Sequence, residues 1–328
     1  ATTHRIDIDE VNEHFEFPIN GTLKNVLFDN QAMVLAQVKE KKASSWYVHQ
    51  YYNGKRWRAR RDALNNGIKD RTPEANKMVL DALDDPFWDI RLTAIEKVTL
   101  LAGADKSIAL EKLKTLAQND PSSAVRSSAI SSLSTMLGEV EATPIMERAV
   151  QSDSSYMVVN NALNQLSKMN PQSAMKLAKP LENERSSSML TGIATLYARH
   201  GKAEQFAFFE RILNSNVLQG FDNVGALYNF SAFLVGKDLS LFQKSVKIYE
   251  NKAKNGDMYS KMYMGNYLEQ LTTHLEERIV GFKEEQNKQK QAGNANGVDV
   301  AKANQAEAQA LIVEFKRIIA IVGEEEGH

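Results

Sequence analysis

Residues 84–98, DDPFWDIRLTAIEKV, carry a pattern that recurs along the chain on both sides of this stretch. Asp85 and Pro86 predict the start of a helix, because an aspartate side chain caps free N–H groups and proline suits the first helical turn. Apolar residues then recur at helical spacing and predict one buried stripe: Ile90, Ala94, Ile95, Val98 and Leu101. Arg91 is expected at the edge of this stripe, within reach of a carboxylate on a neighbouring repeat.

The pattern returns 35 residues later with aspartate, proline, arginine and alanine in register: Asp120, Pro121, Arg126 and Ala129. A weaker copy begins at Asp153, where serine replaces the proline and valine replaces the arginine. Further matches include Arg60 upstream, at an offset of 31, and Gly192 downstream, at an offset of 30. A helical pair that repeats every 30 to 35 residues indicates a HEAT-like or armadillo-like solenoid.

We therefore predict an all-α superhelix with a short β segment at its N-terminus. Residues 1–45 are expected to be a linker or the tail of a preceding domain, residues 46–200 HEAT-like repeats, and residues 201–328 degenerate or capping helices of the same solenoid. Two short strands are expected at residues 26–28 and 33–38, on either side of a turn from Asp29 to Gln31. Because two isolated strands are marginally stable, the chain is expected to be part of a longer protein.

The C-terminal part differs in composition from the repeats. Residues 258–282 predict a long amphipathic helix, and residues 305–322 predict a final helix that closes the solenoid. Between them, residues 283–303 are polar and include Gly293 and Gly297, which predicts a mobile turn.

Composition excludes several classes of partner. The formal net charge is −1, so no global field attracts nucleic acid or an anionic membrane. There are no cysteines, which excludes disulfides and thiolate metal sites. No apolar run of about 18 residues predicts a membrane span, and no signal peptide is visible, so the compartment stays open.

The sequence predicts no catalytic, cofactor-binding or metal-binding residue in this chain. No histidine has a second one three to five residues away: His4, His14, His49, His200, His274 and His328. His274 is interpreted as a solvated helical histidine, and no Gly-rich phosphate loop or GxSxG motif occurs.

Three clusters have both a functional and a structural interpretation. The basic run at residues 55–61 can bind an acidic partner, but Arg60 is favoured as the structural arginine of its repeat. Phe87 and Trp88 can form a contact surface, but packing in the core is favoured. A tyrosine and methionine stripe can line a ligand groove, although packing between helices is favoured: Met258, Tyr259, Met262, Tyr263, Met264 and Tyr267.

Five segments in order resemble the C-terminal part of aminopeptidase N type zinc peptidases: VLFDN (26–30), VLAQV (34–38), RRDAL (60–64), DPFWDIR (85–91) and DPSSAVR (120–126). The resemblance covers residues 15–200. It implies that residues 15–38 are the tail of a β-sandwich domain, that a catalytic domain holding zinc comes before it, and that the helical domain caps the active-site cavity and limits which peptides enter.

The catalytic HExxH motif and the GxMEN motif of that family are absent from this chain, so no site residue carries over. The implied partners are the preceding catalytic and β-sandwich domains of the same polypeptide and the peptide substrate in the cavity. No cofactor is expected in this chain, and zinc is expected in the catalytic domain. The alternative is a free-standing HEAT-repeat scaffold that binds a protein partner.

Overall fold

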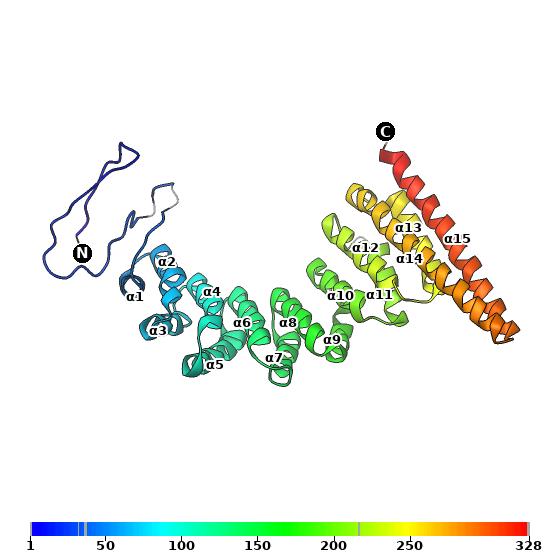
Figure 1. Ribbon diagram of the computed structural model, residues 1–328, viewed down its shortest axis with the longest axis horizontal. Coiled ribbons are helices and arrows are strands. Elements are labelled where there is room, and N and C mark those ends of the chain that lie inside the picture. Colours follow the sequence, from blue (N-terminus) through cyan, green and yellow to red (C-terminus); the bar gives the residue numbers. More distant parts are fainter. Residues whose placement is uncertain (1, 32, 36–37, 216, 327–328) are drawn as a thin grey trace. The chain divides into compact units, whose positions relative to one another are not determined.

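The computed structural model describes residues 2–31, 33–35, 38–215 and 217–326 (Figure 1). The chain divides into two compact units, one up to Glu111 and one from Lys112 onward. The described helices of the first unit are α1 (Ser44–Asn53), α2 (Trp57–Gly67), α3 (Pro73–Ala82), α4 (Trp88–Lys97) and the start of α5 (Gly103–Asn119), with short 3-10 helices at Ile68–Asp70 and Val98–Leu100. The second unit continues with α6 (Ser123–Met136), α7 (Glu139–Ser152), α8 (Tyr156–Met169), α9 (Pro171–Ala178), α10 (Ser187–His200), α11 (Phe206–Asn214), α12 (Phe221–Leu234), α13 (Leu239–Asn255), α14 (Met258–Gln291) and α15 (Ala295–Glu326), with 3-10 helices at Lys179–Asn183 and Ala203–Gln205.

Within the second unit the helices form two layers. In one layer α6 packs on α8, α8 on α10, α10 on α12 and α12 on α14, while the other layer contains the pairs α7 with α9 and α11 with α13. The apolar stripes predicted from the repeats lie between the layers and are buried: Ala129, Ile130, Leu133, Ala162, Leu163 and Leu166. Each buried Leu or Ile contributes about 1.5–3 kcal/mol relative to an exposed one, so the stripe is what holds a repeat together.

The helices begin later than the aspartate and proline predict. α4 begins at Trp88, three residues after Asp85, and α6 and α8 also begin three residues after their aspartates. The Asp85 carboxylate accepts the Phe87 N–H at 2.9 Å, and Asp120 and Asp153 accept the N–H two residues ahead at 2.8 Å. These aspartates therefore close the loop before the helix and do not cap the helix itself.

The repeat arginines join neighbouring repeats, as the sequence predicts. In the first unit Arg60 forms an ion pair with Asp85 at 2.6 Å, and in the second unit Arg126 forms an ion pair with Asp153 at 2.7 Å. Arg126 also donates to the Asp120 carbonyl at 2.8 Å. Arg91 makes the corresponding bond to the Asp85 carbonyl at 2.8 Å.

The predicted N-terminal strands are not found: residues 2–31, 33–35 and 38–43 contain no strand and no helix. Ala36 and Gln37 of the second predicted strand lie outside the described residues. The turn itself is present, because Asp29 has a φ of 46° and its carboxylate accepts the N–H groups of Met33 and Val34. The two arms form no ladder, since a strand needs a partner for its N–H and C=O groups and the described chain offers none.

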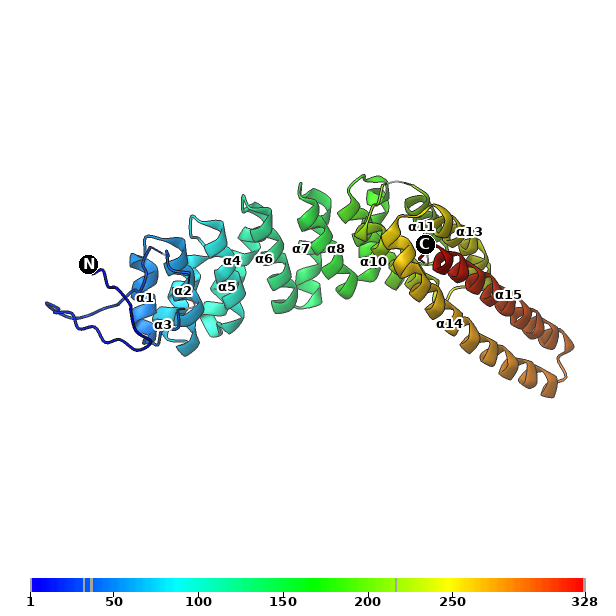
Figure 2. The ribbon, with the colours of Figure 1, turned by 90° about the horizontal axis from the view of Figure 1, so that it is seen from above.

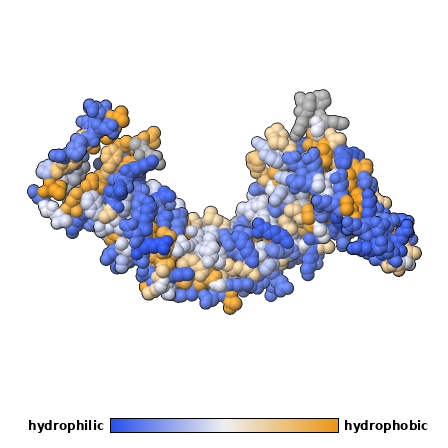
Figure 3. Space-filling model, viewed as in Figure 1, coloured by the Kyte–Doolittle hydropathy of each residue, from blue (hydrophilic) through white to orange (hydrophobic). Residues whose placement is uncertain are grey.

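The predicted mobile segment at residues 283–303 is mostly helical. α14 runs on to Gln291 and α15 begins at Ala295, so that only three residues form the turn, with Gly293 at a φ of 69°. The two helices lie side by side over their length (Figure 2). Lys, Glu, Gln and Ala are good helix formers, and these residues dominate the outer end of the hairpin, whose surface is hydrophilic in Figure 3.

Candidate functional site

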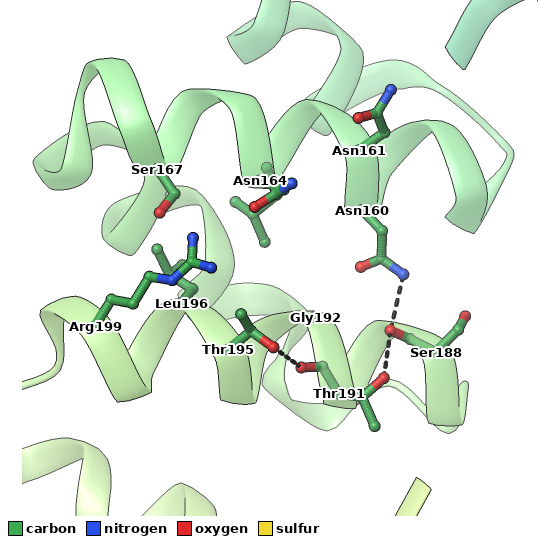
Figure 4. Close-up of a pocket in the computed structure, with 11 residues that line it drawn as sticks. Asn160, Asn161, Asn164, Ser167, Ser188, Thr191, Gly192, Thr195, Leu196 and Arg199 are labelled. Atoms are coloured by element: carbon green, nitrogen blue, oxygen red, sulfur yellow. Dashed lines mark hydrogen bonds between the residues drawn. The ribbon is translucent and has the colours of Figure 1, made fainter. Parts of the chain in front are cut away.

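The candidate site is a cavity of about 500 Å³ between α8 and α10, which are neighbours in one layer of the second unit (Figure 4). Its walls are mostly amide and hydroxyl side chains: Asn160, Asn161, Leu163, Asn164, Ser167, Ser188, Thr191, Gly192, Thr195, Leu196 and Arg199. This volume lies within the range of about 300–1,000 Å³ that is typical of ligand sites.

Asn160 spans the two helices at one end of the cavity. Its side-chain amide donates to the Ser188 carbonyl at 2.8 Å, while its Oδ1 atom is buried and has no hydrogen-bond partner among the described residues. Gly192 makes room for this arrangement, because a Cβ atom there would lie 2.5 Å from Asn160 Oδ1. Gly192 therefore has a packing role in the middle of α10, where glycine is otherwise unfavourable.

Ser167 lies at the other end of the α8 wall. The residue is only 3% exposed, and its hydroxyl has no hydrogen-bond partner in the part of the chain that the structure describes. In Figure 4 the hydroxyl points from α8 into the space toward α10. A buried polar group without a partner costs about 1–3 kcal/mol, so such a group calls for an explanation.

The α10 wall presents two threonines and an arginine, one turn apart. Thr191 and Thr195 donate their hydroxyl hydrogens to carbonyls of α10 itself, which leaves their oxygen lone pairs to accept; Thr195 also accepts from Asn229 of α12 at 3.3 Å. Arg199 is exposed and is the only charged residue among those that line the cavity, and no ion pair or hydrogen bond of its side chain is found among the described residues. Asn164 of α8 is also exposed.

This set of side chains suits binding more than catalysis. The lining contains no carboxylate or imidazole to act as a general base beside its hydroxyls. Over all residues described, no group of three or more His, Cys, Asp or Glu side chains gathers where it could hold a metal ion. None of the described helices is both long and apolar enough to cross a membrane.

The sequence of the second and third repeats matches a known family. Residues 76–167, from α3 to α8, match the model of HEAT repeats. These residues form HEAT-like repeats. No curated protein matches the chain. The loop aspartates and the arginines of the HEAT-like repeats thus bind one repeat to the next, and the α8 wall of the cavity lies within the matched residues.

The basic cluster predicted at residues 55–61 has a structural role in the first unit. Besides the pair of Arg60 with Asp85, Arg61 lies 3.9 Å from Asp89 and Arg58 lies 4.0 Å from Asp62. Three of its cations therefore have acidic neighbours, which supports the structural interpretation.

The interpretation of Phe87 and Trp88 as core residues is wrong for Trp88. Trp88 is 44% exposed and, with Phe87 and the 45% exposed Trp57, forms a chain of ring contacts at 6.0 and 6.2 Å. The reason is the late start of α4, which places Trp88 at the first helical position and leaves the first buried position to Ile90.

The tyrosine and methionine stripe is mostly exposed, and only Met264 is fully buried. Tyr259 stacks on Phe221 of α12 at 4.9 Å, so this stripe and α12 form an exposed aromatic patch on the second unit.

His274, interpreted as solvated, lies against the turn before α13. Its Nε2 atom accepts the Gly236 N–H at 3.4 Å, and its ring stacks on Phe242. Burial and the nearby Arg278 charge lower the pKa of His274, which favours the neutral ring that this hydrogen bond requires.

Sequence reasoning missed the cavity residues. The available signal was the run Asn160, Asn161 and Asn164 inside one helix, since asparagine is a poor helix former. Asn161 is explained by its bonds to Ser127 and Ser131 of α6 at 2.7–3.0 Å, but Asn164 makes no such bond among the described residues.

Proposed function

We propose that this chain is the non-catalytic C-terminal helical domain of an aminopeptidase N type metallopeptidase, where it caps the active-site cavity and restricts which peptides enter. The five segments that resemble this family support the proposal, together with the HEAT-like repeats that follow the N-terminal segment.

The observation that carries the proposal is the character of residues 2–38. Large apolar side chains on this segment are exposed: Ile8, Val11, Phe15, Phe17, Ile19, Leu23, Val26, Phe28, Met33, Val34, Leu35 and Val38. They gather at the left of Figure 3. Phe15, Phe17 and Ile19 alternate as in a strand with one buried face. A contiguous exposed apolar surface of this kind marks an interaction site, and a preceding β-sandwich would pair with it and cover it.

In this role the chain acts through binding and exclusion. A wall of stacked helices over a peptidase cavity limits the size of the peptides that enter and keeps bulk water out. Zinc, when bound in the preceding catalytic domain, activates the attacking water. Because no group of potential ligands gathers among the residues described here, we assign no zinc ligand to this chain.

The size of the natural polypeptide tests this proposal. An immunoblot of cells that make the protein, with antibody raised against this chain, is expected to show a band well above 36.7 kDa. That larger protein should release N-terminal residues from peptides, and a zinc chelator should stop the release. A band at 36.7 kDa, or a larger protein without chelator-sensitive activity, would contradict the proposal.

A second candidate function is a free-standing scaffold that binds a protein partner. The exposed aromatic patch on α12 and α14 favours it, because Tyr and Met side chains such as Tyr228, Tyr259, Met262 and Tyr263 are enriched in protein interfaces. The same immunoblot distinguishes the two candidates, since the scaffold requires the band at 36.7 kDa.

A further inference from the structure

The cavity between α8 and α10 contains polar atoms that the fold itself does not satisfy. Ser167 Oγ and Asn160 Oδ1 are both buried without hydrogen-bond partners among the described residues, at opposite ends of the α8 wall. Their positions differ in character: Asn160 offers an acceptor, whereas the Ser167 hydroxyl can donate or accept. A ligand that lies along α8 and carries both donors and acceptors would satisfy both ends at once.

The charge of the cavity selects the sign of the ligand. Arg199 is the only charged residue in the lining, and the lining contains no acidic side chain to neutralise it. Its planar guanidinium presents paired N–H groups that match the two oxygens of a carboxylate. The cavity therefore favours a ligand with a carboxylate at the Ser167 and Arg199 end, the two residues that face each other in Figure 4.

The spacing of the wall residues matches an extended peptide. Asn160 and Asn164 are one helical turn apart, as are Thr191, Thr195 and Arg199 on the facing helix, which corresponds to a rise of about 6 Å per step. An extended chain repeats every two residues, or about 6.6–6.8 Å, so alternate peptide groups can meet successive side chains of the wall. A carboxamide offers one acceptor and two donors, which pair with a peptide N–H and C=O.

We propose that the cavity between α8 and α10 binds a peptide segment in extended conformation, with its main chain along Asn160 and Asn164 and a carboxylate on Arg199. The carboxylate comes from an acidic side chain or from the end of a peptide chain. This inference goes beyond the proposed function and does not depend on it, because a free-standing scaffold would use the same cavity.

The test uses three short peptides as probes of the full chain. One has the sequence Ala-Ala-Glu-Ala-Ala with both ends blocked, the second replaces the Glu by Gln, and the third is blocked penta-alanine with a free C-terminal carboxylate. Titrations followed by the ¹⁵N side-chain signals of Asn160, Asn164 and Arg199 are expected to show saturable shifts with at least one carboxylate peptide, and binding at least tenfold tighter than that of the Gln peptide. Whichever carboxylate peptide binds identifies the source. Equal binding of all three peptides, or no shift at these signals, would overturn the proposal.

Two variants and a matched control separate the two parts of the site. Arg199→Gln should weaken the carboxylate peptide at least tenfold, whereas Arg148→Gln, the same change at an exposed position on α7, should leave it unchanged. Asn164→Ala, also at an exposed position, should weaken every peptide that binds by a similar factor, since it contacts the main chain. If Arg199→Gln and Arg148→Gln behave alike, the cavity is not the binding site.

Discussion

Arg126 is the residue at which two neighbouring repeats of the second unit meet. Its guanidinium binds both oxygens of Asp153, at 2.7 and 2.8 Å, and both side chains are largely buried. Burial raises the pKa of Asp153, but the hydrogen bonds from Arg126 and the Ser155 N–H, with the Arg126 charge, outweigh it and hold the pKa below its usual value. The carboxylate is thus ionised in the folded chain at neutral pH.

We expect Arg126→Gln to lower the free energy of unfolding by about 3 kcal/mol at pH 7, because it leaves the buried Asp153 carboxylate without its counter-charge. Because the pKa of Asp153 is lower in the folded than in the unfolded chain, its ionised form stabilises the fold above about pH 4, and this contribution is lost as the pH falls through the folded pKa. The effect of the substitution should therefore shrink in acid.

Urea unfolding at pH 7 and at pH 3.5 measures both effects. Arg148→Gln is the control, since this exposed arginine on α7 makes no side-chain bond found among the described residues, and its loss should cost less than about 0.5 kcal/mol. An Arg126→Gln variant as stable as this control at pH 7 would show that the ion pair does not join the repeats.

At the scale of helices, Gly192 and Gly225 form a natural comparison. Both lie inside helices of the same layer, but a Cβ atom at 192 would collide with Asn160 Oδ1 at 2.5 Å, whereas one at 225 would meet nothing within 4 Å. We expect Gly225→Ala to stabilise the fold by about 0.5–1 kcal/mol through helix propensity. Gly192→Ala should forfeit this gain and destabilise, because α8 and α10 must move apart or Asn160 must leave its place.

Urea unfolding of the two variants measures this difference. A double variant, Asn160→Ala with Gly192→Ala, removes the colliding amide and should recover much of the stability lost by Gly192→Ala alone. If both glycine variants gained stability equally, the close approach of α8 and α10 at this point would be disproved.

The helices of the repeats were predictable because their apolar stripe and their loop residues lie close together in sequence. Ile90, Ala94 and Ile95 are buried as the spacing predicts. The helix start was misplaced because the Asp85 side chain binds an N–H two residues ahead, a local alternative to capping that the pattern does not distinguish. The cavity was not predictable, because the pairing of Asn160 with Gly192 depends on how two helices, 32 residues apart, pack together.

At the scale of the whole chain, the N-terminal segment and the helices are almost independent. Asn25 donates to Gln50 at 3.3 Å, and Phe28 donates to Glu40 at 3.5 Å. No backbone-to-backbone hydrogen bond involves the described residues before Ala43. The sequence correctly indicated a turn at Asp29, but it could not indicate strands that the segment forms only with a partner.

We expect a chain that lacks residues 1–38 to unfold with nearly the same free energy as the full chain, within about 1 kcal/mol, since few contacts are lost. Thermal unfolding followed by circular dichroism at matched concentrations measures this. A substantially lower melting temperature of the shortened chain would show that the segment supports the helices, and would weaken the assignment of its apolar face to another domain.

The ion pairs between repeats also have an order in time. Arg60 precedes Asp85 by 25 residues and Arg126 precedes Asp153 by 27, so on the ribosome each arginine is made before the aspartate that it binds. At about 5–20 residues per second the partner arrives within roughly one to five seconds. Each finished repeat therefore offers a waiting guanidinium to the next, and the repeats can be joined one at a time while the chain is still being synthesised.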